Sequence, residues 1–74
     1  MSKKSDLKRA ILDSEKEIGE LENKIRRSQT ALLQSILNDT KLNEQDAQYF
    51  RLYTSLIEVE RENLRKLKNE LNNL

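Results

Sequence analysis

The sequence has no cysteine, histidine, proline or tryptophan, and it has one glycine among its 74 residues. Without cysteine and histidine, it lacks thiol redox chemistry, the usual zinc ligands and the commonest general base. It also has no glycine-rich loop of the kind that holds phosphate groups. These absences argue against an enzyme, so we expect no catalytic residues, no cofactor, no metal site and no small-molecule ligand.

An excess of charge of one sign and long apolar runs are missing as well. The 14 Lys and Arg residues nearly balance the 13 Asp and Glu residues, and the net charge is +1. No large field therefore steers the chain towards nucleic acid or an anionic membrane. No apolar run approaches the roughly 20 residues that span a bilayer, and residues 1–5 are too polar for a signal peptide. We expect a cytoplasmic protein with no membrane partner.

The sequence does contain two long amphipathic stretches separated by a short polar segment. Their apolar residues recur at helical spacing, which predicts an all-α fold, an antiparallel two-helix hairpin over residues 1–74. We expect a helix over about residues 5–38, a turn at about 39–43 and a helix over about 44–73. Ser5, followed by Asp6, is the expected first N-cap, Asn38 the left-handed helix end and Asn43 the second N-cap.

The apolar residues of both stretches follow the alternating steps of three and four that define a coiled-coil seam. A turn centred at 42–43 pairs Ser14 with Leu71, and a serine opposite a large residue suits close packing. Ile25 then faces Glu60, which either leans outward to an arginine or forms a polar layer that fixes the register. The predicted intrachain seam consists of Ile11, Ile18, Leu21, Ile25, Leu32, Phe50, Tyr53, Ile57, Leu64, Leu67 and Leu71.

A second apolar stripe occurs only in the half of the hairpin next to the turn. Two facing helices bury one stripe each, so this stripe has no partner inside the chain, and Ile36 is assigned to the edge of the seam. A single core in so short a chain supplies only ~3–5 kcal/mol, which favours association with further helices. Homodimerisation into a four-helix bundle and a groove for a client helix both remain open. The predicted partner interface consists of Leu33, Leu37, Tyr49, Leu52, Leu56 and Val59.

Part of the chain resembles the second helix of the small co-chaperones that keep type III secretion needle subunits from polymerising. The resemblance is carried by the stretch from Lys41-Leu42 to Gln48-Tyr49, by Leu56-Ile57-Glu58 and by Glu62-Asn63-Leu64. It implies a cytoplasmic hairpin that pairs with a second chaperone through one apolar face. The contact residues would be Tyr49, Leu52, Leu56 and Val59.

A second set of residues resembles Rop, the plasmid copy-number regulator, an antiparallel dimer of hairpins that binds paired RNA loops. This set consists of Arg27-Ser28-Gln29-Thr30, Leu33, Leu37-Asn38 and Glu44-Gln45. Gln29 falls where that family has an RNA-contacting glutamine, whereas Leu21, Ile25 and Ile36 stand at the positions of its other contacts. The resemblance therefore supports the fold more than it supports RNA binding.

The sequence as a whole predicts a protein–protein interaction module. We expect an assembly adaptor or small chaperone that works as a homodimer or with a different helical partner. The alternatives are a dimeric RNA-binding regulator of the Rop type and a structural coiled-coil subunit of a larger complex.

Overall fold

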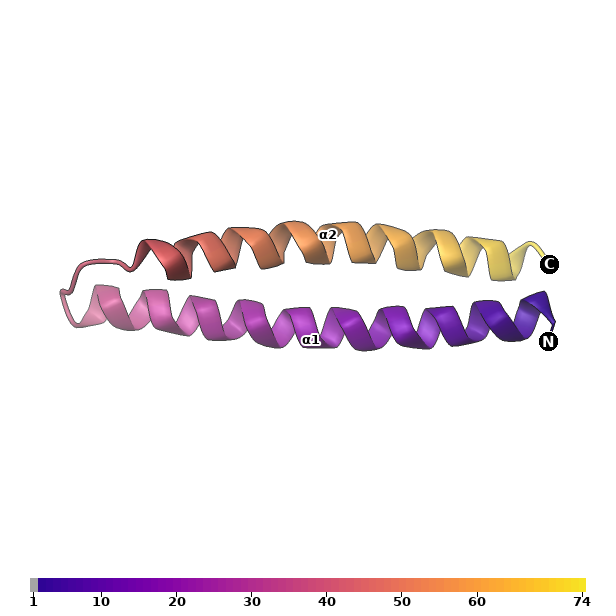
Figure 1. Cartoon of the computed structure of the whole chain (residues 1–74), viewed down its shortest axis with the longest axis horizontal. Helices are drawn as coiled ribbons and strands as arrows, with labels where there is room; N and C mark the ends of the chain where they lie inside the picture. Colours follow the sequence, from indigo (N-terminus) through magenta and orange to yellow (C-terminus); the bar gives the residue numbers. More distant parts are fainter. Residues whose placement is uncertain (1) are drawn as a thin grey trace.

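The computed structural model describes residues 2–74, which form two helices and no strand: α1 (Lys3–Leu37) and α2 (Glu44–Asn72). The helices run antiparallel, with the two termini at one end and the loop 38–43 at the other (Figure 1). The hairpin measures 55 × 15 × 14 Å, and its radius of gyration is 16.8 Å, against the ~11 Å of a compact domain of this length. The predicted all-α hairpin is confirmed.

The first helix begins earlier than expected. Its N-cap is Ser2, whose Oγ accepts a hydrogen bond from the backbone N–H of Ser5 at 3.1 Å. Ser5 is therefore the third residue of the helix and not its cap, because Ser2 is extended (φ −79°, ψ 155°) and already satisfies an orphan amide. The second N-cap is Asn43, as predicted, and its Oδ1 accepts from Gln45 N at 2.8 Å.

The C-terminus of α1 closes in a Schellman motif. The N–H of Thr40 donates to Ser35 O at 2.9 Å, and the N–H of Asp39 donates to Ile36 O at 3.2 Å. Asp39 has a φ of 53°, in the left-handed region, whereas Asn38 keeps a φ of −89°. The prediction of a left-handed Asn38 was wrong by one residue, since the cap bonds place the reversal after Asn38.

Asp39→Gly should raise the free energy of unfolding by about 0.5–1 kcal/mol, because glycine adopts a positive φ without a Cβ clash. Urea unfolding followed by circular dichroism, at matched protein concentration, measures the change. Asn38→Gly is the control and should give no gain, because its φ is already in the right-handed region. Equal effects at the two positions would contradict the Schellman geometry.

Three contacts between side chains of α1 and α2 determine the register of the two helices. Ser14 Oγ donates to Glu60 Oε1 at 2.7 Å. Lys24 Nζ lies 5.5 Å from the centre of the Tyr53 ring. Arg61 Nη2 and Glu22 Oε1 are 3.6 Å apart. In an antiparallel coiled coil, each layer of the seam pairs unlike heptad positions of the two helices. One register does this and also fits all three contacts. It puts Ser14 level with Leu64, Leu21 level with Ile57 and Lys24 level with Thr54.

The predicted register, with Ser14 opposite Leu71, is therefore wrong by one heptad. In that register Ser14 would lie roughly 16 Å along the helix axis from Glu60, at 1.5 Å per residue, too far for their hydrogen bond. Glu60 is consequently level with Ile18 and not with Ile25. The heptad pattern alone allows both registers because it repeats every seven residues.

The predicted seam residues line the interface between the helices, and none of them is exposed. Ile11, Leu21 and Ile57 are buried, and Leu21 and Ile57, level with each other, are each 3% exposed. Half-buried are Ile18, Ile25, Leu32, Phe50, Tyr53, Leu64, Leu67 and Leu71. Leu7, which is not among the predicted seam residues, is also buried, because the corrected register brings it level with Leu71.

A cysteine pair distinguishes the two registers, since the chain has no native cysteine. Ser14→Cys combined with Leu64→Cys should form an intrachain disulfide rapidly, because these positions share a layer of the seam. Ser14→Cys combined with Leu71→Cys is the matched control and should oxidise slowly. Non-reducing electrophoresis of monomeric product at low protein concentration measures both. A faster reaction in the Leu71 pair would restore the register first expected.

Candidate partner interface

The exposed apolar side chains are concentrated in the half of the hairpin next to the turn. Ten large apolar residues are exposed among those described, and all but Leu12 and Leu74 lie between Leu33 and Val59. The six residues of the predicted partner interface are all among them, and their exposed fractions range from 41% at Tyr49 to 82% at Leu37. The buried apolar residues, by contrast, are Leu7, Ile11, Leu21 and Ile57.

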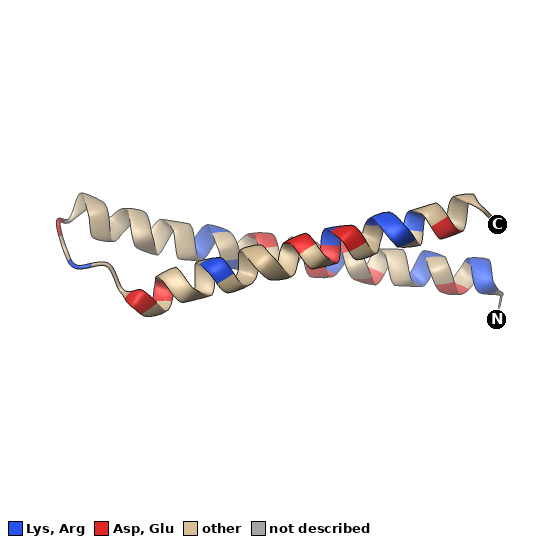
Figure 2. Cartoon of the chain, turned by 90° about the horizontal axis from the view of Figure 1, so that it is seen from above, with Lys and Arg blue, Asp and Glu red and all other residues tan. Residues whose placement is uncertain are grey.

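Charged residues are distributed in the opposite way. From residue 28 to residue 38, α1 and its cap carry no charged side chain, and from 47 to 57 α2 carries only Arg51. Figure 2 shows this as a continuous tan ribbon along α1 near the turn, with blue and red segments towards the termini. The terminal half thus has a solvated surface, whereas the turn half presents apolar side chains to water.

Two of the interhelix contacts mark the two flat faces of the hairpin. The Arg61–Glu22 ion pair spans the helices on one face, and Lys24 lies over the Tyr53 ring on the other. Glu22 and Lys24 are separated by about 200° of rotation at 3.6 residues per turn, so they flank the seam from opposite sides. In a coiled coil, residues seven apart lie on the same side of a helix. The other side chains can therefore be assigned to one face or the other by their spacing from Glu22 and Lys24.

The face marked by Glu22 carries the exposed apolar residues of α1, and we call it the leucine face. Ile36, two heptads after Glu22, lines a hollow of about 330 Å³ there together with Leu33, Leu32, Phe50 and Gln29. Leu37 follows Leu33 by four residues and lies at the outer edge of this face. Ile36 is 62% exposed, so it belongs to this surface and not to the seam, where the sequence pattern had put it.

The face marked by Lys24 carries the exposed apolar residues of α2, and we call it the tyrosine face. The Tyr49 ring stacks on that of Tyr53, with centroids 6.0 Å apart and planes 18° from parallel. Gln45 Nε2 donates to Tyr49 Oη at 2.9 Å. The tyrosine face consists of Tyr49 and Leu56, seven apart, and of Leu52 and Val59, also seven apart.

The six predicted interface residues are therefore divided between two surfaces. Leu33 and Leu37 belong to the leucine face, and the four residues of α2 belong to the tyrosine face. The two sets are on opposite sides of the hairpin, so a single flat partner surface cannot cover both. That these residues contact a partner stays a prediction.

Glu60 forms a polar layer within the seam and does not lean out to an arginine. Its Oε1 accepts from Ser14 Oγ at 2.7 Å and from Asn63 Nδ2 at 3.2 Å. Ser14 is 3% exposed and Glu60 is half-buried. A hydrogen bond to a charged group in so shielded a place is stronger than an ordinary one, and it requires the observed register.

Replacing Ser14 by alanine should lower the free energy of unfolding by about 1–2 kcal/mol, since it removes a charge-assisted hydrogen bond. Ser35→Ala is the matched control, because the Ser35 hydroxyl donates to Ala31 O of its own helix and its loss should cost less than about 0.5 kcal/mol. Combining Ser14→Ala with Glu60→Leu in a double-mutant cycle, measured by urea unfolding, should give a coupling near ~1 kcal/mol. Strict additivity would show that the two groups do not interact.

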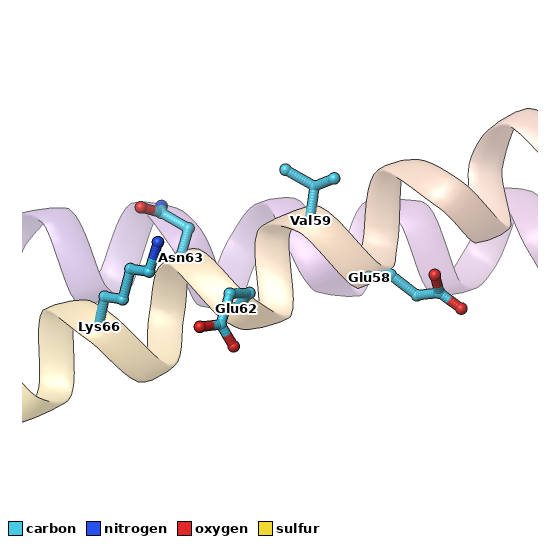
Figure 3. A pocket seen from close by; sticks show the side chains of 5 residues that line it. All are labelled: Glu58, Val59, Glu62, Asn63 and Lys66. Atoms are coloured by element: carbon cyan, nitrogen blue, oxygen red, sulfur yellow. The ribbon is translucent and has the colours of Figure 1, made fainter.

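A further hollow, of about 480 Å³, lies on α2 where the tyrosine face ends. Its lining residues, Glu58, Val59, Glu62, Asn63 and Lys66, all project from α2 (Figure 3). Next to it, Arg65 Nε donates to Glu62 Oε2 at 2.9 Å, a hydrogen bond that lowers the pKa of Glu62 and raises that of Arg65. Both groups therefore stay charged at neutral pH.

Residues 2–74 contain no candidate for two other kinds of site. No group of three or more Asp or Glu side chains in this range could hold a metal ion. Neither α1 nor α2 is long and apolar enough in its described residues to cross a membrane. In comparisons with known proteins, no family model, curated protein or solved structure matches the chain.

Proposed function

We propose that this hairpin is a cytoplasmic protein–protein interaction module, an assembly adaptor or small chaperone, that buries an apolar helix of another polypeptide against its turn half. The observation that supports this proposal is the leucine face, where Leu33 and Ile36 are 58% and 62% exposed around a hollow. A contiguous apolar patch of this kind, bordered by polar residues, is typical of an interaction surface. In this role the chain binds and has no catalytic function.

The mechanism is burial of one helix in a groove between two others. Leu32 and Phe50, both half-buried, form the floor of the hollow, and Leu33 and Ile36 form its α1 wall. A client helix that inserts apolar side chains at one-turn intervals would complete a bundle at this position. Because α1 carries no charged residue from 28 to 38, the contacting stripe of the client should be uncharged as well.

The resemblance to needle-subunit co-chaperones supports the adaptor or chaperone form of this proposal, because those proteins are hairpins that pair through an apolar face. A structural coiled-coil subunit would use the same surface permanently. A chaperone or adaptor would release its client, whereas a structural subunit would keep its partner bound. Structured RNA is the alternative ligand, since Gln29 is exposed and lines the hollow of the leucine face.

Leu33→Glu combined with Ile36→Glu should abolish association with the client, because each change removes apolar burial and puts a carboxylate into a dry interface. The loss should exceed a hundredfold in Kd, on the order of 3 kcal/mol or more. Co-purification of the tagged chain from its native host, followed by mass measurement of the intact complex, identifies the client. Calorimetry of the purified pair then measures the effect.

Leu12→Glu is the control, because Leu12 is 67% exposed but lies in the terminal half. It should leave the complex unchanged. Unchanged association of the Leu33/Ile36 variant would contradict the proposal. A salt-sensitive complex with structured RNA that Gln29→Ala abolishes would replace it by RNA binding.

A further inference from the structure

We propose that the tyrosine face binds a second copy of this chain, with the two hairpins antiparallel around a two-fold axis at the level of Thr54. This dimer extends the proposed function, because it uses the face that a client on the leucine face leaves open. It does not depend on a client, so either proposal can fail without the other.

The spacing of the tyrosine face is what a two-fold interface requires. Tyr49, Leu52, Leu56 and Val59 are separated by steps of three, four and three, which read the same in both directions. When α2 packs antiparallel on a copy of itself, Tyr49 meets Val59 and Leu52 meets Leu56, in the alternating layers of a coiled coil. The axis then passes at Thr54, midway between Leu52 and Leu56.

The charges of α1 on the same face are self-complementary about the same axis. Glu20, Lys24 and Arg27 line one hollow together with Asn23. Thr54 is level with Lys24 in the register of the hairpin, so the two-fold axis brings Arg27 of each copy within one residue of the level of Glu20 of the other. The two Lys24 side chains lie level with each other at the axis, and their repulsion is offset because each lies over its own Tyr53 ring and one turn from Glu20 of the second copy. Opposite charges therefore meet twice, which favours this pairing.

The ends of the interface match as well. The same pairing brings Gln45 of one copy level with Asn63 of the other, and Asn63 lines the hollow shown in Figure 3. Val59, the apolar residue of that hollow, is the one that meets Tyr49 of the second copy.

Charge selects the antiparallel arrangement. The four tyrosine-face residues are 41–68% exposed in the single hairpin, and a second copy in either orientation would cover them. In a parallel dimer, Lys24 and Arg27 of one copy would lie on Leu52 and Leu56 of the other, and their burial without partners is unfavourable.

A mixture of two single-cysteine variants tests the geometry. Leu52→Cys mixed with Leu56→Cys should form an intermolecular disulfide at least tenfold faster than either variant alone, because Leu52 meets Leu56 and not itself. Equal rates in the mixture and in the separate variants, or no disulfide in any sample, would overturn the proposal. Neither change adds charge, so the test does not depend on a disruptive substitution.

Sedimentation equilibrium over a hundredfold concentration range tests the dimer itself. The unmodified chain should be dimeric, and Leu52→Glu with Leu56→Glu should weaken dimerisation by a hundredfold or more. The matched control, Leu33→Glu with Ile36→Glu on the opposite face, should dimerise normally. A monomeric parent, or equal weakening by both pairs, would overturn the proposal.

A charge exchange tests the axis. Arg27→Glu should weaken the dimer, because it puts two carboxylates together at each Glu20 contact. Adding Glu20→Arg in the same chain should restore the affinity. Failure of the second change to restore the affinity would exclude this axis.

Discussion

The whole structure depends on one seam, and a seam between two helices can bury only one stripe of each. In the terminal half and the middle of the hairpin this is enough, because Leu7, Ile11, Leu21 and Ile57 are buried and charged residues cover the outside. In the turn half it is not enough. There the seam residues are only half-buried, and leucines, an isoleucine, a tyrosine and a valine remain in water. The candidate partner interface is thus the apolar surface that a two-helix fold cannot cover by itself.

The heptad pattern predicts the hairpin and the seam but not the register. Any shift by seven residues again pairs unlike heptad positions, so apolar layers alone do not choose between the alternatives. The choice depends on single polar groups, above all on the Ser14 hydroxyl, which reaches Glu60 only in the observed register. The shape of the loop contributes too, because the Schellman motif reverses the chain at Asp39 and moves the bend towards α1. The hydrogen bond and the loop shape both depend on individual atoms, and a periodic pattern of apolar residues contains no information about them.

The exposure of the candidate site and its division into two faces can both be predicted from the sequence, although the single stripe first expected missed the division. An apolar residue outside the heptad seam is expected to be exposed, and this holds for Leu33 and Leu52 alike. Antiparallel helices that share a seam bring like flanking positions together, so the heptad position of each residue fixes its face. The contacts of Glu22 with Arg61 and of Lys24 with Tyr53 agree with this division. The 62% exposure of Ile36, next to the seam, is not predictable in this way, because it depends on how far the second helix covers that side chain.

Two faces also change what a dimer of this chain can do. A two-fold interface uses the same surface on both subunits, so pairing through the tyrosine face leaves the leucine face free on each copy. In the proposed dimer the tyrosine faces point inward, so the two leucine faces would point outward on opposite sides. The antiparallel arrangement places them towards opposite ends of the dimer, since each lies near its own turn. A dimer built in this way is bivalent, and bivalency is the property that lets a small hairpin connect two clients instead of merely covering one.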